Sequence, residues 1–195
     1  NLGVNINIPY FWAIDKDKDL TINNRLLVTE HPLFLGEYRQ AFKSSNLVSN
    51  FGYTEGYKTQ TKKNIFDGDR SHFFTRFKKI FESDNSKQSN LEVNLQHVSD
   101  KKYLKLYRVE SDLVNYEDSI LKNTISFDHF DNEENLSVAL DASIFRNLTD
   151  KYDDKYEYIL PELNLSKFLY NEDLGYGNIR SNLKFHNYNT NKSKK

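Results

Sequence analysis

The feature that most constrains this chain is an alternation of apolar and polar residues with a period of two. Residues 2–12 and 91–97 show it, and in residues 136–145 one parity is wholly apolar: Leu136, Val138, Leu140, Ala142 and Ile144. Successive side chains of a β-strand point to opposite faces, so each segment predicts a strand with one apolar and one polar face. The spacing of an amphipathic helix fits none of these segments well.

The alternation predicts an all-β fold, an antiparallel up-and-down meander of about ten long strands. We place the strands at residues 2–12, 19–28, 33–42, 46–57, 70–81, 90–98, 116–130, 136–146, 156–168 and 178–188. The apolar residues change parity at Pro161, which predicts a β-bulge, a place where a proline can sit without losing a ladder hydrogen bond.

Strand length and the placement of aromatic residues favour a transmembrane barrel. Strands of about 5–6 residues are typical of soluble proteins, whereas membrane-spanning strands need about 9–11. Many aromatic residues lie near predicted strand ends, as in the girdles of outer-membrane barrels: Tyr10, Phe11, Trp12, Phe42, Tyr57, Phe81, Tyr116, Tyr156, Phe168 and Tyr188. A soluble β-sandwich or solenoid, whose strands also alternate, is the alternative.

Composition excludes several classes of function. The net charge of -1 gives no general attraction to nucleic acid, and the absence of Cys excludes disulfides, thiolate metal sites and a Cys nucleophile within these 195 residues. The chain has no Met and starts with Asn, so we expect it to begin inside a longer protein. The five His residues show no metal-binding spacing, and Leu20 replaces the glycine that a calcium loop starting at Asp15 requires. We predict no enzyme, cofactor or metal.

The predicted connectors alternate in length. The longer ones, at 58–69, 99–115 and 147–155, follow even-numbered strands, and the mostly shorter ones, at 43–45, 82–89 and 131–135, follow odd-numbered strands. Outer-membrane barrels have short periplasmic turns and longer extracellular loops. We therefore expect the even-numbered strands to run outward and the first strand to run toward the periplasm.

Several short motifs occur in order over nearly the whole chain: Ile8-Pro9-Tyr10-Phe11-Trp12-Ala13-Ile14, Asp19-Leu20-Thr21-Ile22, Gly36-Glu37-Tyr38-Arg39, Arg70-Ser71-His72-Phe73-Phe74, Val98-Ser99-Asp100-Lys101-Lys102-Tyr103-Leu104 and Leu160-Pro161-Glu162-Leu163. In these motifs and their order the chain resembles the LPS-assembly outer-membrane protein family (LptD, also called OstA or organic solvent tolerance protein). Each motif is weak alone, and their order makes the resemblance specific.

The resemblance implies a translocon in the outer membrane of a Gram-negative bacterium that inserts lipopolysaccharide into the outer leaflet. It implies an outer-membrane lipoprotein plug (LptE-like) and a periplasmic bridge protein (LptA-like) as partners. Residues 1–195 would form one partial barrel domain, without the family's N-terminal periplasmic jelly roll and closing strands. A general porin or receptor barrel and a soluble β-rich binding module remain the alternatives.

Pro9 is the candidate gate residue, because prolines in the first strands of the family loosen the seam where the barrel opens sideways. A strand-end proline without any gating role is the alternative. The expected lumen-facing residues are Glu37, Arg39, Arg76, Lys78, Glu92 and Asp141. Arg76 and Lys78 share a parity with His72, and such a basic stripe either meets lipid phosphates or is simply a solvated wall.

Overall fold

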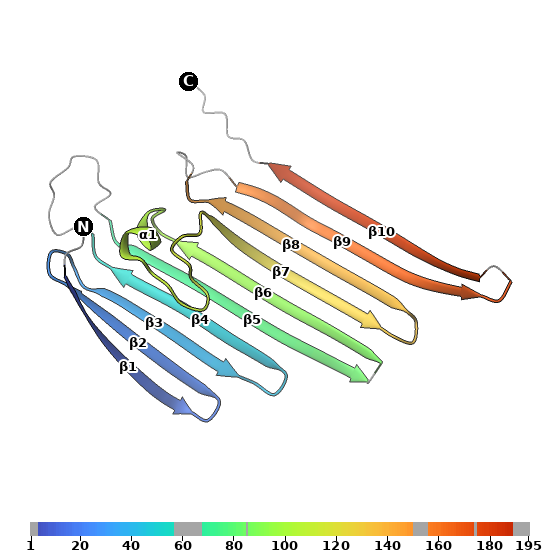
Figure 1. Cartoon of the computed structure of the whole chain (residues 1–195), viewed down its shortest axis with the longest axis horizontal. Coiled ribbons are helices and arrows are strands. Elements are labelled where there is room, and N and C mark those ends of the chain that lie inside the picture. The colour runs from blue at the N-terminus through green and yellow to red at the C-terminus, as the bar shows by residue number, and fades with distance from the viewer. Residues whose placement is uncertain (1–3, 57–67, 85, 150–155, 174, 189–195) are drawn as a thin grey trace, which may run out of the picture. The chain divides into compact units, whose positions relative to one another are not determined.

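The computed structural model describes residues 4–56, 68–84, 86–149, 156–173 and 175–188. These residues form one open sheet of ten strands in an antiparallel up-and-down order, in which each strand pairs with the next along the chain (Figure 1). The strands are β1 (Asn5–Asp15), β2 (Lys18–Leu27), β3 (Leu33–Ala41), β4 (Ser45–Thr54), β5 (Arg70–Asp84), β6 (Lys87–Val98), β7 (Ile120–Asp131), β8 (Leu136–Asn147), β9 (Tyr156–Asn171) and β10 (Gly175–Tyr188). A short helix, α1 (Tyr103–Tyr107), lies between β6 and β7.

The predicted meander of about ten long strands is confirmed, with two differences in the connectors. The segment 82–89, predicted as a connector, mostly belongs to β5 and β6, because antiparallel partners extend each other down to a tight hairpin. The strand predicted from residue 116 begins at Ile120, because residues 99–119 contain α1 and turns. The predicted loop 58–69 lies largely outside the described residues.

The bulge predicted at Pro161 is present. Asp141 pairs with Glu162 and Ser143 pairs with Ile159, so two residues of β9, Leu160 and Pro161, stand opposite one residue of β8. The register of β9 against β10 shifts at the same place. Proline therefore occupies a position where the ladder is already interrupted on both sides.

The chain divides into two compact units, which are described separately below. The first unit comprises residues 1–42, 46–76 and 95–119, and the second comprises residues 43–45, 77–94 and 120–195. The first contains β1 to β4, part of β5, the end of β6 and α1, while the second contains β7 to β10 and the remaining parts of β5 and β6.

The strand register assigns the side chains of each unit to two chemically different faces. One row across the first unit contains Tyr10, Ile22, Gly36 and Phe51. One row across the second contains Leu91, Phe127, Leu140, Leu163 and Leu183. We call the faces that carry these rows the hydrophobic face. The opposite faces carry rows such as Glu92, Ser126, Asp141, Glu162 and Lys184, and we call them the polar face.

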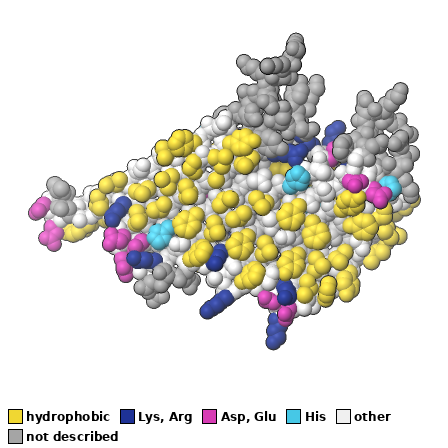
Figure 2. All heavy atoms as spheres, turned by 180° about the vertical axis from the view of Figure 1, so that it is seen from behind, with side chains coloured by type: hydrophobic (Ala, Val, Ile, Leu, Met, Phe, Trp, Pro, Cys, Tyr) yellow, Lys and Arg dark blue, Asp and Glu magenta, His cyan; other side chains and the backbone are white. Residues whose placement is uncertain are grey.

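The hydrophobic face is exposed rather than packed into a core. Ile8, Tyr10 and Trp12 are 50–60% exposed, and Ile125 is 52% exposed. In Figure 2, which looks onto this face, hydrophobic side chains predominate and charged side chains lie mainly toward its margins. Most of the deeply buried apolar residues instead belong to the first unit: Leu33, Phe74, Val98, Tyr103, Leu104, Tyr107, Val109 and Val114, while Leu121 is buried in the second.

Candidate functional site

The first strand forms one edge of the sheet and carries Pro9. In the described part of the chain β1 pairs with β2 alone, and Pro9 stands opposite Asn23 within that ladder. Proline has no backbone N–H, so this position supplies no hydrogen-bond donor to either side of the strand. The predicted gate residue therefore lies within the one ladder that holds β1 among the described residues, opposite a polar-face residue of β2.

An ion-paired cluster lies on the polar face of the first unit, close to the turn between β1 and β2. The Nε of Arg39 in β3 donates to Oδ1 of Asp19 in β2 at 3.0 Å, and Glu37 Oε1 is 3.9 Å from the same Nε. Glu37 and Arg39 were both predicted to face a lumen, and the register places both on the polar face. Paired in this way, they form a hydrated wall of low net charge.

A second row of charges crosses the polar face of the second unit. Lys78 Nζ lies 3.0 Å from Glu92 Oε2, and at the other end Lys184 Nζ lies 3.2 Å from Glu162 Oε2. Asp141 stands between them in the register, opposite Glu162 on one side and Ser126 on the other. Lys78, Glu92 and Asp141, which were predicted to face a lumen, thus lie on the polar face. Arg76, in the first unit, has the same parity in β5 as His72 and Lys78.

The segment 99–119 folds back onto the polar face of the first unit (Figure 1). Its apolar side chains provide the contact: Tyr103, Leu104 and Tyr107 of α1, with Val109 and Val114 beyond it, are each at most 4% exposed. Tyr103, Leu104 and Tyr107 fall on one side of a single helical turn, which explains why a short helix forms here. The segment is therefore a packed cap rather than a free loop.

Backbone groups at both ends of α1 have defined partners. Before the helix, Asp100 Oδ1 accepts the N–H of Lys102 at 2.9 Å. The helix ends at Arg108, which has a left-handed backbone with φ of 48°, and the next N–H, of Val109, returns to the carbonyl of Leu104 at 3.0 Å. The guanidinium of Arg25 in β2 donates to the carbonyls of Tyr107 and Arg108 at 2.9 and 3.3 Å. A strand side chain thereby stabilises the C-terminal end of the helix.

A buried polar cluster joins this cap to β4 and β5. His72 Nε2 is 2.7 Å from Oδ1 of Asn50, and His72 Nδ1 is 3.1 Å from the hydroxyl of Tyr103. Gly52 in β4 makes room for the contact, because a Cβ there would lie 2.5 Å from Cε1 of His72 and 2.7 Å from the Tyr103 oxygen. Burial raises the pKa values of Tyr103 and Tyr107, so both phenols are neutral under ordinary conditions.

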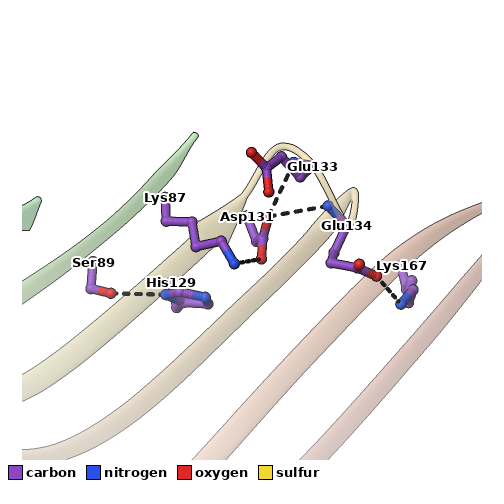
Figure 3. A network of polar contacts seen from close by, with 7 residues as sticks. All are labelled: Lys87, Ser89, His129, Asp131, Glu133, Glu134 and Lys167. Carbon is purple, nitrogen blue, oxygen red and sulfur yellow. Dashed lines mark hydrogen bonds and ion pairs between the residues drawn. The ribbon is translucent and has the colours of Figure 1, made fainter. Parts of the chain in front are cut away.

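At the short-turn end of the second unit the hydrophobic face ends in a charged collar, drawn in Figure 3. Asp131 accepts the backbone N–H groups of Glu133 and Glu134 at 3.0 and 3.1 Å, and its other oxygen lies 3.1 Å from Lys87 Nζ. Lys167 Nζ lies 3.1 Å from Glu134. The next row of the same face holds Ser89 and His129, hydrogen-bonded at 2.8 Å, and continues into the apolar Val138 and Leu165 on β8 and β9. The row after it contains Phe127.

The sequence indicates the polar and hydrophobic faces of the sheet, but it does not indicate that residues 99–119 form a packed cap. The six predicted lumen-facing residues share the polar face, but the histidines were interpreted as scattered, whereas His72 is the centre of a buried cluster. The signal for the cap was the set of apolar residues in a segment assigned as a polar loop.

The aromatic residues predicted near strand ends do not all lie on one face of the sheet. Tyr10 and Trp12 lie on that face, but Phe11 and Phe168 lie on the polar face. Tyr116 lies outside any strand, and Tyr57 lies outside the described residues.

No known protein-family model matches the chain, and no curated protein sequence is significantly similar to it. Within the described residues, no helix is long and apolar enough to cross a membrane. The same residues contain no group of three or more His, Cys, Asp or Glu side chains arranged to hold a metal ion.

Proposed function

We propose that this chain is part of an outer-membrane β-barrel that inserts lipopolysaccharide into the outer leaflet of a Gram-negative outer membrane. The observation that carries the membrane part of the proposal is the hydrophobic face. It presents Ile, Leu, Phe, Tyr and Trp side chains without a covering layer among the described residues, opposite a face of ion pairs and amides. Exposed apolar patches on proteins in water rarely exceed a few hundred Å², so this face calls for an apolar environment.

The charged collar supports the same placement. Lys87, Asp131 and Lys167 lie at the end of the hydrophobic face, and on β6 and β7 a polar pair and then an apolar pair of side chains follow behind them. A hydrocarbon layer requires this order, because charged groups are costly at the bilayer centre and cheap at the interface. A membrane also requires every backbone group to be paired, so further strands must close the two edges of the open sheet.

The lipopolysaccharide part of the proposal is supported by the ordered motifs and by Pro9 on the edge strand. An edge strand that carries a residue without an N–H forms a ladder with fewer possible hydrogen bonds than its neighbours. At such a seam the acyl chains of the lipid pass sideways into the bilayer, while its glycan remains in contact with the polar face. A lipoprotein plug and a periplasmic bridge protein are the partners that the motifs imply.

Replacing Pro9 with Ala tests the seam. The variant gains a backbone donor at the edge strand, so we expect slower insertion, less surface lipopolysaccharide and weaker exclusion of large antibiotics. Asn7→Ala is the matched control, because it lies two residues away on the same face of β1 and keeps its N–H. Equal lipopolysaccharide levels and antibiotic sensitivity in the Pro9→Ala and Asn7→Ala strains would argue against a gating role.

A general porin is the second candidate, favoured by the cap. Segment 99–119 is packed against the polar face of the first unit, and in a closed barrel it would narrow the lumen. The two functions differ in their cargo. Passage of small sugars through the protein in liposomes, together with unchanged lipopolysaccharide export in the Pro9→Ala strain, would favour a porin.

A further inference from the structure

Three aromatic rings stand on the polar face at the tip of the β9–β10 hairpin. Tyr170 and Tyr176 are paired across the two strands, with ring centroids 5.0 Å apart, and the ring of Phe168 lies 5.7 Å from that of Tyr176. Tyr170 is 63% exposed and Tyr176 is 76% exposed. The last residue of β9 that pairs with β8 is Lys167, opposite Leu136, so the rings extend past the end of β8.

The rings lie on the wrong face to belong to a lipid-facing girdle. Phe168 and Tyr170 have the parity of Glu162, Asn164 and Ser166 along β9, and Tyr176 of β10 is paired with Tyr170. Leu163, Leu165 and Leu169 have the other parity and point to the hydrophobic face. Large aromatic groups that are exposed to water in a cluster are uncommon unless they bind something. Their position on the polar face points to a ligand that arrives through water.

The surroundings of the rings define the chemistry of that ligand. The polar face of the hairpin continues from the rings into a ladder of hydrogen-bonding side chains. Ser166 donates to Asn178 at 3.2 Å, Asn182 donates to Asn164 and to Glu162, and Glu162 is paired with Lys184. Between the rings and the Glu162–Lys184 pair, the other described side chains on this face of the hairpin are polar: Asn164, Ser166, Asn178, Arg180 and Asn182.

We infer that this hairpin is a binding site for a linear oligosaccharide, which stacks on Tyr170, Tyr176 and Phe168 and hydrogen-bonds to the neighbouring amides. A pyranose ring has an apolar face of C–H groups and a rim of hydroxyls, which match aromatic rings beside Asn, Ser and Glu side chains. Tyrosines provide rigid contact area at a low cost in conformational entropy. A protein partner fits less well, because the centre of a protein interface is depleted in charged residues, and this strip ends in the Glu162–Lys184 pair.

The oligosaccharide site on the β9–β10 hairpin needs only a polar face that is exposed to water. It does not depend on lipopolysaccharide export or on Pro9. If Pro9→Ala did not change lipopolysaccharide insertion, the sugar site would be unaffected. If no sugar bound the hairpin, the proposed gating role of Pro9 would be unaffected. The two proposals therefore fail independently.

Saturation-transfer NMR on the full chain as it is made in the cell, purified in a detergent without a sugar headgroup, tests the site. The probes are maltohexaose and the tetramer of N-acetylglucosamine. We expect transfer to the C–H protons of at least one sugar, and about tenfold weaker binding in the Tyr170→Ala, Tyr176→Ala double variant. Leu169→Ala is the matched control, because it removes an exposed side chain from the other face of the same strand.

Tyr176→Phe keeps the stacking surface and should bind like the unmodified protein. No transfer to either sugar would overturn the inference. Equal transfer to the sugars from the double variant and from the unmodified protein would also overturn it. So would the finding that neither sugar binds while another protein co-purifies with the unmodified chain but not with the double variant.

Discussion

The hydroxyl of Tyr103 in α1 lies 3.1 Å from Nδ1 of His72 in β5. Because the Asn50 Oδ1 that faces Nε2 can only accept, Nε2 carries the ring proton, and Nδ1 therefore accepts the proton of the Tyr103 hydroxyl. One neutral histidine thus links β4, β5 and the cap, with both ring nitrogens satisfied. Buried polar groups that are fully paired in this way fix a single arrangement of the elements that carry them.

The fit of this cluster around Gly52 is a first prediction. In Gly52→Ala the new Cβ would meet buried ring atoms of His72 and Tyr103 at 2.5–2.8 Å, and these atoms are held by hydrogen bonds. We expect the docking of segment 99–119 to weaken by about 1–3 kcal/mol, measured as faster amide hydrogen exchange in that segment.

Gly36→Ala is the matched control for this prediction. Its Cβ would lie 2.4 Å from the Phe51 ring, but that ring is exposed on the hydrophobic face and can turn away. We expect little change in exchange of segment 99–119 in this variant. Equal exchange in the two variants would mean that the cap is not held at Gly52.

Alkaline pH should release the cap. Burial raises the pKa of Tyr103 above its ordinary value of 10.0, and it raises that of Tyr107 in the same direction. Below pH 10 both phenols are neutral whether the cap is docked or open, so their contribution is fully present. Above pH 10 the two phenols lose their protons more readily when segment 99–119 is undocked than when it is docked. The stability of the docked segment therefore falls as the pH rises through the pKa values that the phenols have in the docked state.

Hydrogen exchange of segment 99–119, corrected for the intrinsic pH dependence of exchange, measures this release. Protection should hold to about pH 10 and decline above it. Tyr103→Phe should shift or reduce the decline. Constant protection to well above pH 10 would contradict the burial of these phenols.

The ends of the strands give a topological prediction. The longer connections, at 28–32, 55–69, 99–119 and 148–155, all follow even-numbered strands, and the last three correspond to the longer connectors expected from the sequence. If these connections are extracellular, a cysteine at Lys105 should react with an impermeant maleimide on intact cells, and a cysteine at Lys16, in the β1–β2 turn, should react only after the outer membrane is opened. Reaction of the Lys16 variant alone on intact cells would reverse the assignment.

The sequence was informative where side-chain parity decides the structure. The strands, the polar face and the bulge at Pro161 all follow from which residues share a parity, and the bulge is visible as a parity change between Leu160 and Leu163. Parity also puts Glu92 and Asp141 in one row with Ser126.

The cap could not be predicted from parity, because its contacts join residues far apart in sequence. His72 and Tyr103 are separated by 31 positions and belong to different kinds of element. The alternation of β5 gives no sign that a helix will cover His72 and Phe74. Phe168 was assigned to a girdle from its position near a strand end, whereas its parity with Glu162 along β9 places it on the polar face.

The central claim is that one face of the sheet contacts lipid and the other contacts water. Ile125 and Ser126 are neighbours in β7 that point to opposite faces, and the chain has no native cysteine. Spin labels on Ile125→Cys and Ser126→Cys, in the full chain reconstituted into vesicles, measure access to oxygen and to a water-soluble nickel complex. We expect the Ile125 label to collide mainly with oxygen and the Ser126 label mainly with the nickel complex. Equal access of the nickel complex to both labels would contradict the membrane barrel.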